Sequence, residues 1–478
     1  MLIDFLAVLG AVVPLYVAIG LGYISVRWWK VLNPEQSSGI NSFVSNFAIP
    51  VLVLDLLSAN NPYTMNFKAI AADVLQKVVI FIPLIAWKNL SKNGSFDWVI
   101  TIFGLSTLSN TLLVGLPLVQ SMYGDGSYSL LVQLVVIQSL IWMNVLLALY
   151  EYRAASILIA EKFPTTAGSI GSVRVDPDVS SFSDLEQLET DAEVGSDGKL
   201  HVVVRSFSVS SGISLGSFRS MDSADELNLW ATGSFPRQYS SRRSGSSRSF
   251  GHPERHYHKQ RSHNTSRVAD SSFDIEAIAE ASESSHHHVE TAPNSSALIN
   301  QDVAKKESPP AGVVAKLIII TVWRKLIRNP NTYASVVGLI WSLIAFRFNI
   351  EMPLIIKGSI TIISKTGIGM AMFSLGLFIA LQPKIISIKL PMLVTCTAIR
   401  LILGPVVMAA TSVAVGLHGI VFDTATVQAA LPLSIVCFVF AKQYNIHPEI
   451  FSTTIIITTA LFLPVTIVCY LILRLVPW

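Results

Sequence analysis

Several of the most apolar stretches of this chain contain ionisable or strongly polar side chains. Asp73 and Lys77 are four residues apart with Gln76 beside them, so on a helix they share one face and can form an ion pair. Such groups are costly to bury in a membrane and are functional hypotheses by default. Two interpretations stay open: a polar support cluster that stands in place of a bound cation or acts as a proton-linked switch, or a pair that only neutralises itself while Lys77 extends toward water.

A second concentration of small polar residues runs from Ser106 to Thr111 and includes Ser109 and Asn110. A helix that unwinds here would present backbone N–H groups and a positive helix end, which attract a carboxylate. The amide of Asn110 would add a further donor. Hydrogen bonding between neighbouring helices is the alternative, but the central position in the apolar stretch and the nearby Pro117 favour a ligand site.

Three more polar residues lie within or at the start of later apolar segments. Gln138 and Asn331 could contact a ligand, pack in a helix bundle or cap a helix, and these alternatives stay open. Arg400 lies deep in an apolar segment, where a guanidinium must pair or reach water. It therefore balances either an anionic ligand or a helix C-terminus.

Residue patterns that catalysis would need do not occur in the sequence. There is no phosphate-binding loop of the Walker type and no Ser/His/Asp or metalloprotease spacing. The three cysteines are scattered through apolar segments, and the tract His286–His288 alone is weak evidence for a metal. We therefore predict no catalytic residue, no metal site and no cofactor, and a net charge of +3 gives no reason to expect nucleic acid.

The composition places these residues in a membrane. Apolar residues make up 51% of the chain and charged residues only 14%, against about 25% in typical soluble domains. We predict four regions: a first transmembrane repeat (1–155), a hydrophilic cytosolic loop (156–312), an amphipathic pre-helix (313–330) and a second transmembrane repeat (331–478).

Each apolar block divides into five segments of membrane-spanning length. The predicted spans are 5–26, 39–58, 68–88, 98–122 and 128–152, then 331–348, 353–381, 388–417, 422–442 and 450–475. An odd number of spans inverts the second repeat, and the fourth span of each half carries a similar phrase, around Pro117 and around Pro432, where we expect the two helices to be interrupted at a crossover. We therefore expect an all-α polytopic membrane protein of two inverted five-helix repeats. Interrupted helices in inverted repeats are typical of secondary transporters.

Basic residues in the short loops predict the orientation of the spans. One side carries Arg27, Lys30, Lys88, Lys92, Lys384, Lys389 and Lys442. The opposite side carries Lys68, Arg347, Lys357 and Arg474. The first side, which also holds the hydrophilic loop, is predicted to be cytosolic, so both termini are extracytosolic.

The hydrophilic loop is rich in Ser, His, Arg, Asp and Glu. This composition cannot bury enough apolar surface to fold alone, so we predict that the loop is mostly disordered. Only Lys199–Arg205, with its β-branched centre, favours a short strand. Serines near arginines are candidate sites for basophilic kinases: Ser206, Ser208, Ser220, Ser244 and Ser249. An ordinary Ser/Arg-rich loop explains the same pattern.

Several phrases occur together and in a fixed order along the chain. The first half contains Val13-Pro-Leu-Tyr-Val-Ala18, Ser38-Gly-Ile-Asn41 and Asp73-Val-Leu-Gln-Lys-Val78. The loop adds Lys162-Phe-Pro-Thr-Thr-Ala-Gly-Ser169, and the second half adds Asn329-Pro-Asn-Thr-Tyr333 and Phe440-Ala-Lys442. In this combination the chain resembles the PIN-FORMED auxin efflux carriers of plants, over both apolar blocks and the start of the loop.

The resemblance implies a fold like that of the bile-acid/sodium symporters, in which a scaffold domain and a transport domain meet around crossed, broken fourth and ninth helices. It implies export of the indole-3-acetate anion from the cytosol by elevator-type alternating access and a homodimer, and we expect the carrier at the plasma membrane. It places Asp73 and Lys77 in a support site and Ser109 and Pro432 at the crossover. The residues that it places near the ligand are Ile49, Asn110, Gln138, Asn331 and Val436.

Some positions differ from those that the resemblance predicts. Ser109 and Cys437 stand where Pro is expected, Leu433 where Gln is, Met143 where Tyr is and Lys365 where Asp is. These differences bear on rate, substrate preference and membrane address. The alternatives are an endoplasmic-reticulum auxin carrier, a carrier of another organic anion, or a membrane scaffold or sensor whose loop recruits partners. An intramembrane enzyme would lack a catalytic constellation.

Overall fold

The structure is a computed structural model that describes residues 2–163, 169–177, 179, 181–182, 188–194, 199–206 and 311–475. All of these residues belong to one unit of the chain, formed by Met1–Phe235 and Lys306–Trp478. Ser206 is the last residue of a strand. The other candidate kinase sites, Ser208, Ser220, Ser244 and Ser249, lie outside the described residues.

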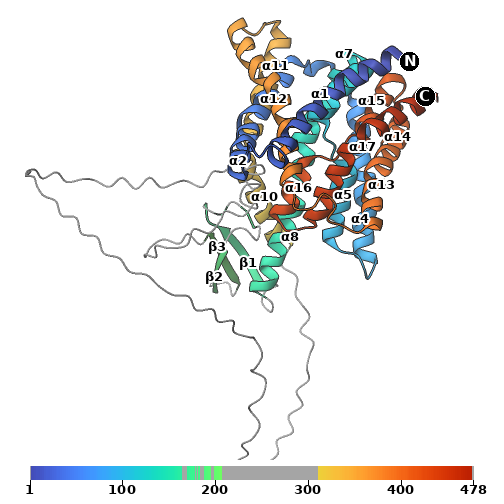
Figure 1. Ribbon diagram of the computed structural model, residues 1–478. Helices are drawn as coiled ribbons and strands as arrows, with labels where there is room; N and C mark the ends of the chain where they lie inside the picture. The colour runs from blue at the N-terminus through green and yellow to red at the C-terminus, as the bar shows by residue number, and fades with distance from the viewer. Residues whose placement is uncertain are drawn as a thin grey trace, which may run out of the picture. The chain divides into compact units, whose positions relative to one another are not determined.

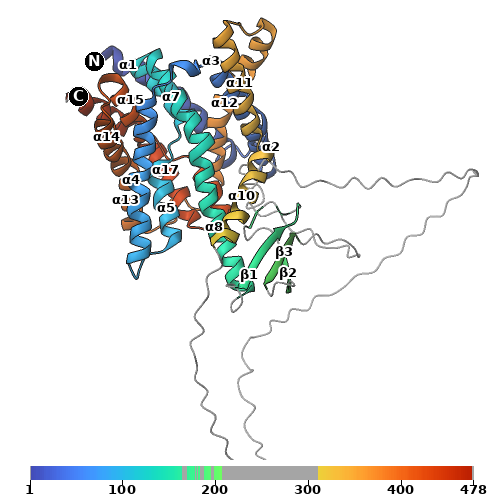
Figure 2. The ribbon, with the colours of Figure 1, turned by 180° about the vertical axis from the view of Figure 1, so that it is seen from behind.

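The first half of the chain is almost entirely helical. Its elements are α1 (Leu2–Arg27), α2 (Pro34–Phe43), η1 (Val44–Ala48), α3 (Ile49–Ala59), η2 (Pro62–Thr64), α4 (Phe67–Leu90), α5 (Phe96–Thr107), η3 (Thr111–Gly115), α6 (Leu116–Tyr123), α7 (Asp125–Ile137), η4 (Gln138–Trp142) and α8 (Met143–Lys162). Here η1, η3 and η4 are single π-helical turns that join the flanking helices, and η2 is a 3₁₀ turn. Figure 2 shows α7 and α8 as one long rod that reaches the strands.

The second half is helical throughout most of its described length. Its elements are α10 (Ala311–Arg328), α11 (Pro330–Phe348), α12 (Leu354–Leu381), α13 (Leu390–Ala398), the π-helical turn η6 (Ile399–Leu403), α14 (Gly404–Val415), α15 (Gly419–Ala429), α16 (Ile435–Gln443) and α17 (Pro448–Leu475). Most of residues 313–330, where we expect a pre-helix, lie in α10.

Seven helices of the described residues are long and apolar enough to cross a membrane. They coincide with the predicted first, second, third, fifth, seventh, eighth and tenth spans. The predicted fourth span is instead broken between α5 and η3, and the predicted ninth between α15 and α16. The predicted sixth span is α11, whose first turn is polar because it contains Asn331 and Thr332.

One group of helices consists of α1, α2 with α3, α11 and α12, which pack against one another (Figure 1). Two glycines permit the closest of these contacts. A Cβ on Gly22 would lie 2.1 Å from the carbonyl oxygen of Phe373, and a Cβ on Gly376 would lie 2.1 Å from that of Ile19. The backbones of α1 and α12 therefore touch, which is how small residues hold helices together in lipid.

The second group of helices consists of α4 to α8 and α13 to α17. Within it, α14 packs against α4 and α15, and α17 packs against α13 and α16. The two groups meet where α1 contacts α6 and where α3 contacts α7. The broken helices belong to the second group, and η3, which follows the first break, contacts α12 of the first group.

The hydrophilic loop contains more structure than its composition predicts. Besides the predicted strand, now β3 (Leu200–Ser206), it forms β1 (Ile170–Val175) and β2 (Leu188–Val194), in the order β1-β3-β2. β1 pairs parallel to β3, and β2 pairs antiparallel to it. The expectation of a mostly disordered loop is therefore wrong for these segments. The sheet does not fold alone, because its buried face packs on α8 and α10 through residues such as Val173, Val204 and Leu317.

Candidate functional site

Short extended segments interrupt the fourth and ninth apolar segments, and they meet. Ser109 and Leu433 pair as an isolated antiparallel bridge. The N–H of Asn110 donates to the carbonyl of Pro432 at 2.8 Å, and the N–H of Ser434 donates to that of Leu108 at 3.1 Å. This pairing satisfies backbone groups that lipid could not hydrogen-bond. Ser109 and Pro432 thus lie where the two chain breaks cross.

Arg400 is a fully buried cation next to this crossing. Its Nε and Nη2 donate to the carbonyl of Leu431 at 2.8 and 2.7 Å, and Nη2 donates to Oγ of Ser109 at 2.5 Å. Its Nη1 donates to the carbonyl of Leu105 at 3.4 Å. Leu105 lies in the last turn of α5 and Leu431 lies just beyond the end of α15, and carbonyls at a helix C-terminus carry partial negative charge. The geometry therefore favours the helix-end role of Arg400.

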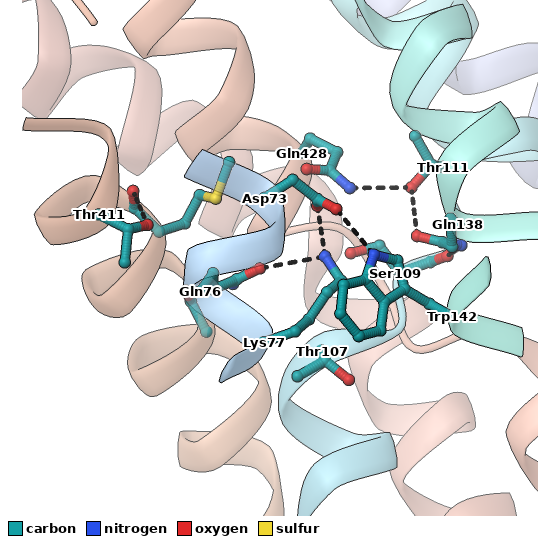
Figure 3. Close-up of polar contacts among 12 residues, drawn as sticks. Asp73, Gln76, Lys77, Thr107, Ser109, Thr111, Gln138, Trp142, Thr411 and Gln428 are labelled. Atoms are coloured by element: carbon teal, nitrogen blue, oxygen red, sulfur yellow. Dashed lines mark hydrogen bonds and ion pairs between the residues drawn. The ribbon is translucent and has the colours of Figure 1, made fainter. Parts of the chain in front are cut away.

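The π-helical turns bring further polar groups to the crossing. Such turns are rare and frequently mark functional sites. Gln138, the first residue of η4, donates through Nε2 to the carbonyl of Ser109 at 2.7 Å. Thr111, the first residue of η3, lies between Gln138 and Gln428, with side-chain contacts of 3.4 Å to each (Figure 3). The crossing is therefore held by side chains from α7–η4 and α15 as well as by its own backbone.

Asp73, Gln76 and Lys77 form a buried cluster on α4 (Figure 3). Nζ of Lys77 donates to Oδ1 of Asp73 and, at 3.3 Å, to Oε1 of Gln76. Nε1 of Trp142 donates to Oδ2 of Asp73 at 3.1 Å, and Nε2 of Gln76 donates to the carbonyl of Gly404 at 3.0 Å. The Lys77 side chain is only 1% exposed. It therefore does not extend to water, and that part of the alternative interpretation is wrong.

A cavity of about 190 Å³ lies beside the crossing, and we call it the crossing cavity. It is bordered by η1, η3, η4, α10, α11 and α16. All five residues that the resemblance places near a ligand line it: Ile49, Asn110, Gln138, Asn331 and Val436. Met143 also lines it, whereas Lys365 is exposed on α12. Pro117 lies in the first turn of α6, away from the break and outside the lining.

The crossing cavity suits an organic anion. Among its lining residues only Lys325 is charged. The N-termini of α11 and α16 lie at its wall, and a helix N-terminus carries partial positive charge. Oγ of Ser45 and Oδ1 of Asn331 are buried without a hydrogen-bond partner among the described residues. The cavity thus offers both positive potential and unused polar groups within an apolar surround.

Lys325 is held at the cavity wall by a second buried network. Its Nζ lies 3.0 Å from Oε1 of Glu151 on α8 and donates to the hydroxyl of Tyr444 at 2.7 Å. Ser181 and the backbone N–H of Phe182, both from the hydrophilic loop, donate to the two carboxylate oxygens of Glu151 at 2.9 and 3.1 Å. The described part of the loop is therefore connected through Glu151 to a residue that lines the crossing cavity.

The sequence analysis does not predict several residues that line the cavity: Ser45, Asn46, Asn144, Lys325 and Asn329. Ser45 and Asn46 are two adjacent polar residues within an apolar stretch, so they could have been proposed as ligand contacts from the sequence. Lys325 interrupts the apolar run of the pre-helix, but only the fold shows that it turns inward. Cys437 lies on α16, with Sγ 3.9 Å from the carbonyl of Gly104, and it does not line the cavity.

Comparison with known proteins places the chain in a family. The family profile described as "Membrane transport protein" matches residues 7–470. The chain is 41% identical to "Probable auxin efflux carrier component 1d" of Oryza sativa subsp. japonica, with 99% of each chain covered. It is 39% identical to "Auxin efflux carrier component 7" of Arabidopsis thaliana and 37% identical to "Auxin efflux carrier component 1" of the same plant, again over 99% of each chain. The chain therefore belongs to the auxin efflux carriers, a family of membrane transporters and not of enzymes.

Proposed function

We propose that this protein exports the indole-3-acetate anion from the cytosol through the crossing cavity. The observation that carries the proposal is the chemistry of that cavity, which has a helix N-terminus at its wall, amide donors and one lysine, but no carboxylate. An amphipathic anion needs an apolar pocket with a few placed donors. The names of the relatives support auxin as the substrate.

The polar groups of the cavity suggest how the ligand is oriented. We place the carboxylate at the N-terminus of α16 with the side-chain amide of Asn110, which has no hydrogen-bond partner among the described residues. Oδ1 of Asn331 is an unpartnered acceptor and suits the indole N–H. Ile49 and Val436 then pack on the ring. Each polar atom of the ligand thus meets a group that is otherwise unused.

The two helix groups support an elevator mechanism. The crossing, the support cluster and α16 belong to one group, so they move together relative to α1, α3, α11 and α12. An anion that leaves an inside-negative cell gains about 2.3 kcal/mol per 100 mV, so the membrane potential and the anion gradient suffice without a coupled ion. The Asp73–Lys77 pair provides fixed charges at the position where other carriers of this kind would bind a cation.

The remaining parts of the proposal follow from the sequence. We propose ten membrane crossings in two inverted repeats, with the loop in the cytosol and both termini outside. We propose plasma-membrane residence, a homodimer and regulation by kinases that act on the loop serines. Fluorescence of a tagged chain in plant cells tests plasma-membrane residence. Retention in the endoplasmic reticulum would favour the internal-membrane alternative.

Efflux of labelled indole-3-acetate from oocytes tests the main proposal. We expect export above the water-injected control, and we expect Asn110→Ala to raise the KM for internal substrate about tenfold or more, because a hydrogen bond to a charged group is worth about 1.5–3 kcal/mol. Asn93→Ala, at an exposed loop position, is the matched control.

The possible outcomes separate the parts of this proposal. Export that is unchanged in Asn110→Ala would remove Asn110 from the site but leave the carrier. A chain that reaches the oocyte surface and exports nothing would contradict the substrate, and the scaffold alternative would then gain weight.

A further inference from the structure

A second cavity lies at the opposite end of the interface between the two helix groups. We call it the outer chamber because it lies at the end predicted to be extracytosolic. Its volume is about 320 Å³. It is lined from α3, α7 and α11, and its polar lining includes Asp55, Asn60, Asn61, Tyr128 and Ser129. Of these, only Asp55 is an acidic residue, and no basic residue lines the chamber.

A small apolar space lies between this chamber and the crossing cavity, and we call it the passage. The passage shares Val53, Val135 and Ser335 with the crossing cavity, and it shares Leu56 and Val132 with the outer chamber. The three spaces therefore follow one another along the same seam between α3, α7 and α11. The passage has a volume of only about 10 Å³, which is roughly the space of one water molecule.

In this structure the passage is too small to admit an organic anion. Apart from Ser139 and Ser335, its lining is aliphatic. An apolar constriction of this size excludes ions because it offers no substitute for their hydration. An anion in the crossing cavity therefore leaves outward only after α7 and η4 move relative to α3 and α11, and it then enters the outer chamber.

The charges along the seam differ in sign from one end to the other. The only charged residue that lines the crossing cavity is Lys325, and the only one that lines the outer chamber is Asp55. Asp55 is half-buried, and it takes part in none of the ion pairs among the described residues. Its negative charge is thus not neutralised by a neighbouring cation.

We propose that the outer chamber is the release chamber for the transported anion and that Asp55 disfavours re-entry of the anion from outside. This inference rests on the proposed export of an organic carboxylate. A single charge in partly aqueous surroundings changes local anion occupancy by about two- to fivefold at physiological salt. Asp55 cannot alter the equilibrium distribution, because a fixed charge adds no driving force. It therefore raises the external KM and speeds outward release together.

Asp55→Asn tests this role, with Glu351→Gln as the matched control. Glu351 lies in the loop between α11 and α12 at the same end of the molecule, outside the outer chamber. Uptake and efflux of labelled indole-3-acetate are measured in the same oocytes. We expect Asp55→Asn to lower the external KM two- to fivefold and to slow outward turnover by a similar factor, with the internal KM unchanged. We expect Asp55→Glu and Glu351→Gln to behave like the wild type.

A cysteine at the same position gives a second, independent test. Asp55→Cys is treated from outside with a thiosulfonate reagent that adds either a sulfonate or an ammonium group. The wild type serves as the reagent control, since Cys396 and Cys437 are buried and Cys469 lies on α17. We expect the anionic adduct to raise the external KM and the cationic adduct to lower it, and we expect the difference to shrink in high salt.

Two results would overturn the inference while the carrier function stands. One is an external KM that is the same for Asp55→Asn and Glu351→Gln. The other is an Asp55→Cys chain that transports but responds equally to both reagents or does not react from outside. Absence of transport in the wild-type chain would instead contradict the proposed function.

Discussion

Three cationic side chains in the described part of the chain are buried near the crossing, and each has a different set of polar partners. Lys77 is paired with Asp73 on its own helix. Arg400 contacts carbonyls and a hydroxyl, and none of the ion pairs among the described residues includes it. Lys325 is paired with Glu151 and also donates to Tyr444. Of these three, Lys325 alone lines the crossing cavity, whereas Lys77 and Arg400 contact groups outside its lining or at the crossing.

The buried cluster of Asp73, Gln76 and Lys77, which we call the support cluster, is expected to affect turnover more than ligand binding. Trp142→Phe keeps a ring over Lys77 but removes the N–H that Asp73 accepts, so part of a buried carboxylate loses its partner. Because Asp73 and Lys77 lie outside the cavity lining, we expect turnover to fall several-fold while the KM for internal indole-3-acetate stays within about twofold.

Trp98→Phe is the control for this measurement. Its ring packs at a tilt against His447 and its N–H has no hydrogen-bond partner among the described residues, so this variant should keep normal turnover. An equal loss in both variants, or a larger change in KM than in turnover for Trp142→Phe, would contradict a role for the cluster in the conformational step.

At the scale of the elements, the closest helix contact is the one between α1 and α12. We expect Gly376→Val to destabilise the protein strongly, because the added side chain would collide with the carbonyl of Ile19. Overpacking usually lowers the free energy of unfolding by about 1–3 kcal/mol. Here the added side chain would meet backbone atoms of Ile19 and Tyr23 on α1, which cannot move aside as a side chain can. Thermal unfolding of the detergent-solubilised protein measures the effect.

The same helix provides the matched control. A Cβ on Gly369 would meet nothing within 4 Å, so Gly369→Val should unfold close to the wild-type temperature. Equal melting temperatures for the two variants would mean that α1 and α12 can separate without loss of stability.

The element level also shows what sequence patterns can and cannot reveal. The spacing of Asp73 and Lys77 predicted their contact because a helix repeats every 3.6 residues. Pro117 does not mark the break in the fourth segment, because proline also fits the first turn of a helix and here lies in the first turn of α6. The break lies at Ser109. The π-helical turns left no recognised signature, yet three of them line the crossing cavity. Their register depends on tertiary contacts, which local sequence does not encode.

The three-stranded sheet of the loop also depends on tertiary contacts that the local sequence does not predict. β1 alternates only partly, and β2 is acidic, so neither pattern favours a strand. Their stability depends on the apolar faces of α8 and α10, which come from opposite sides of the loop in sequence. A composition that cannot fold alone can still fold on a surface supplied by the rest of the chain.

For the whole molecule, Glu151 and Lys325 join the two halves through a buried ion pair. Removing one member leaves the other charged and unpaired, which costs about 3–5 kcal/mol. We therefore expect Glu151→Gln and Lys325→Met each to lower the melting temperature clearly. The double variant should recover part of the loss, because no uncompensated charge then remains.

A thermal-shift series with both single variants and the double variant measures this coupling. Arg153→Gln is a suitable comparison, since the ion pair of Arg153 with Asp97 is partly exposed and worth little. Losses that simply add in the double variant would show that Glu151 and Lys325 do not stabilise the fold as a pair.

The Glu151 network also has a consequence for how the chain is made. The ribosome adds about 5–20 residues per second. Glu151 is therefore synthesised well before Lys325 and Tyr444, and also before α10, on which the loop sheet packs. Until the second half is made, its carboxylate lacks the cation with which it pairs in the folded protein. A first half without the second therefore contains an unpaired carboxylate within an apolar helix bundle. We expect a chain truncated within the loop to be a preferred target for membrane-protein quality control.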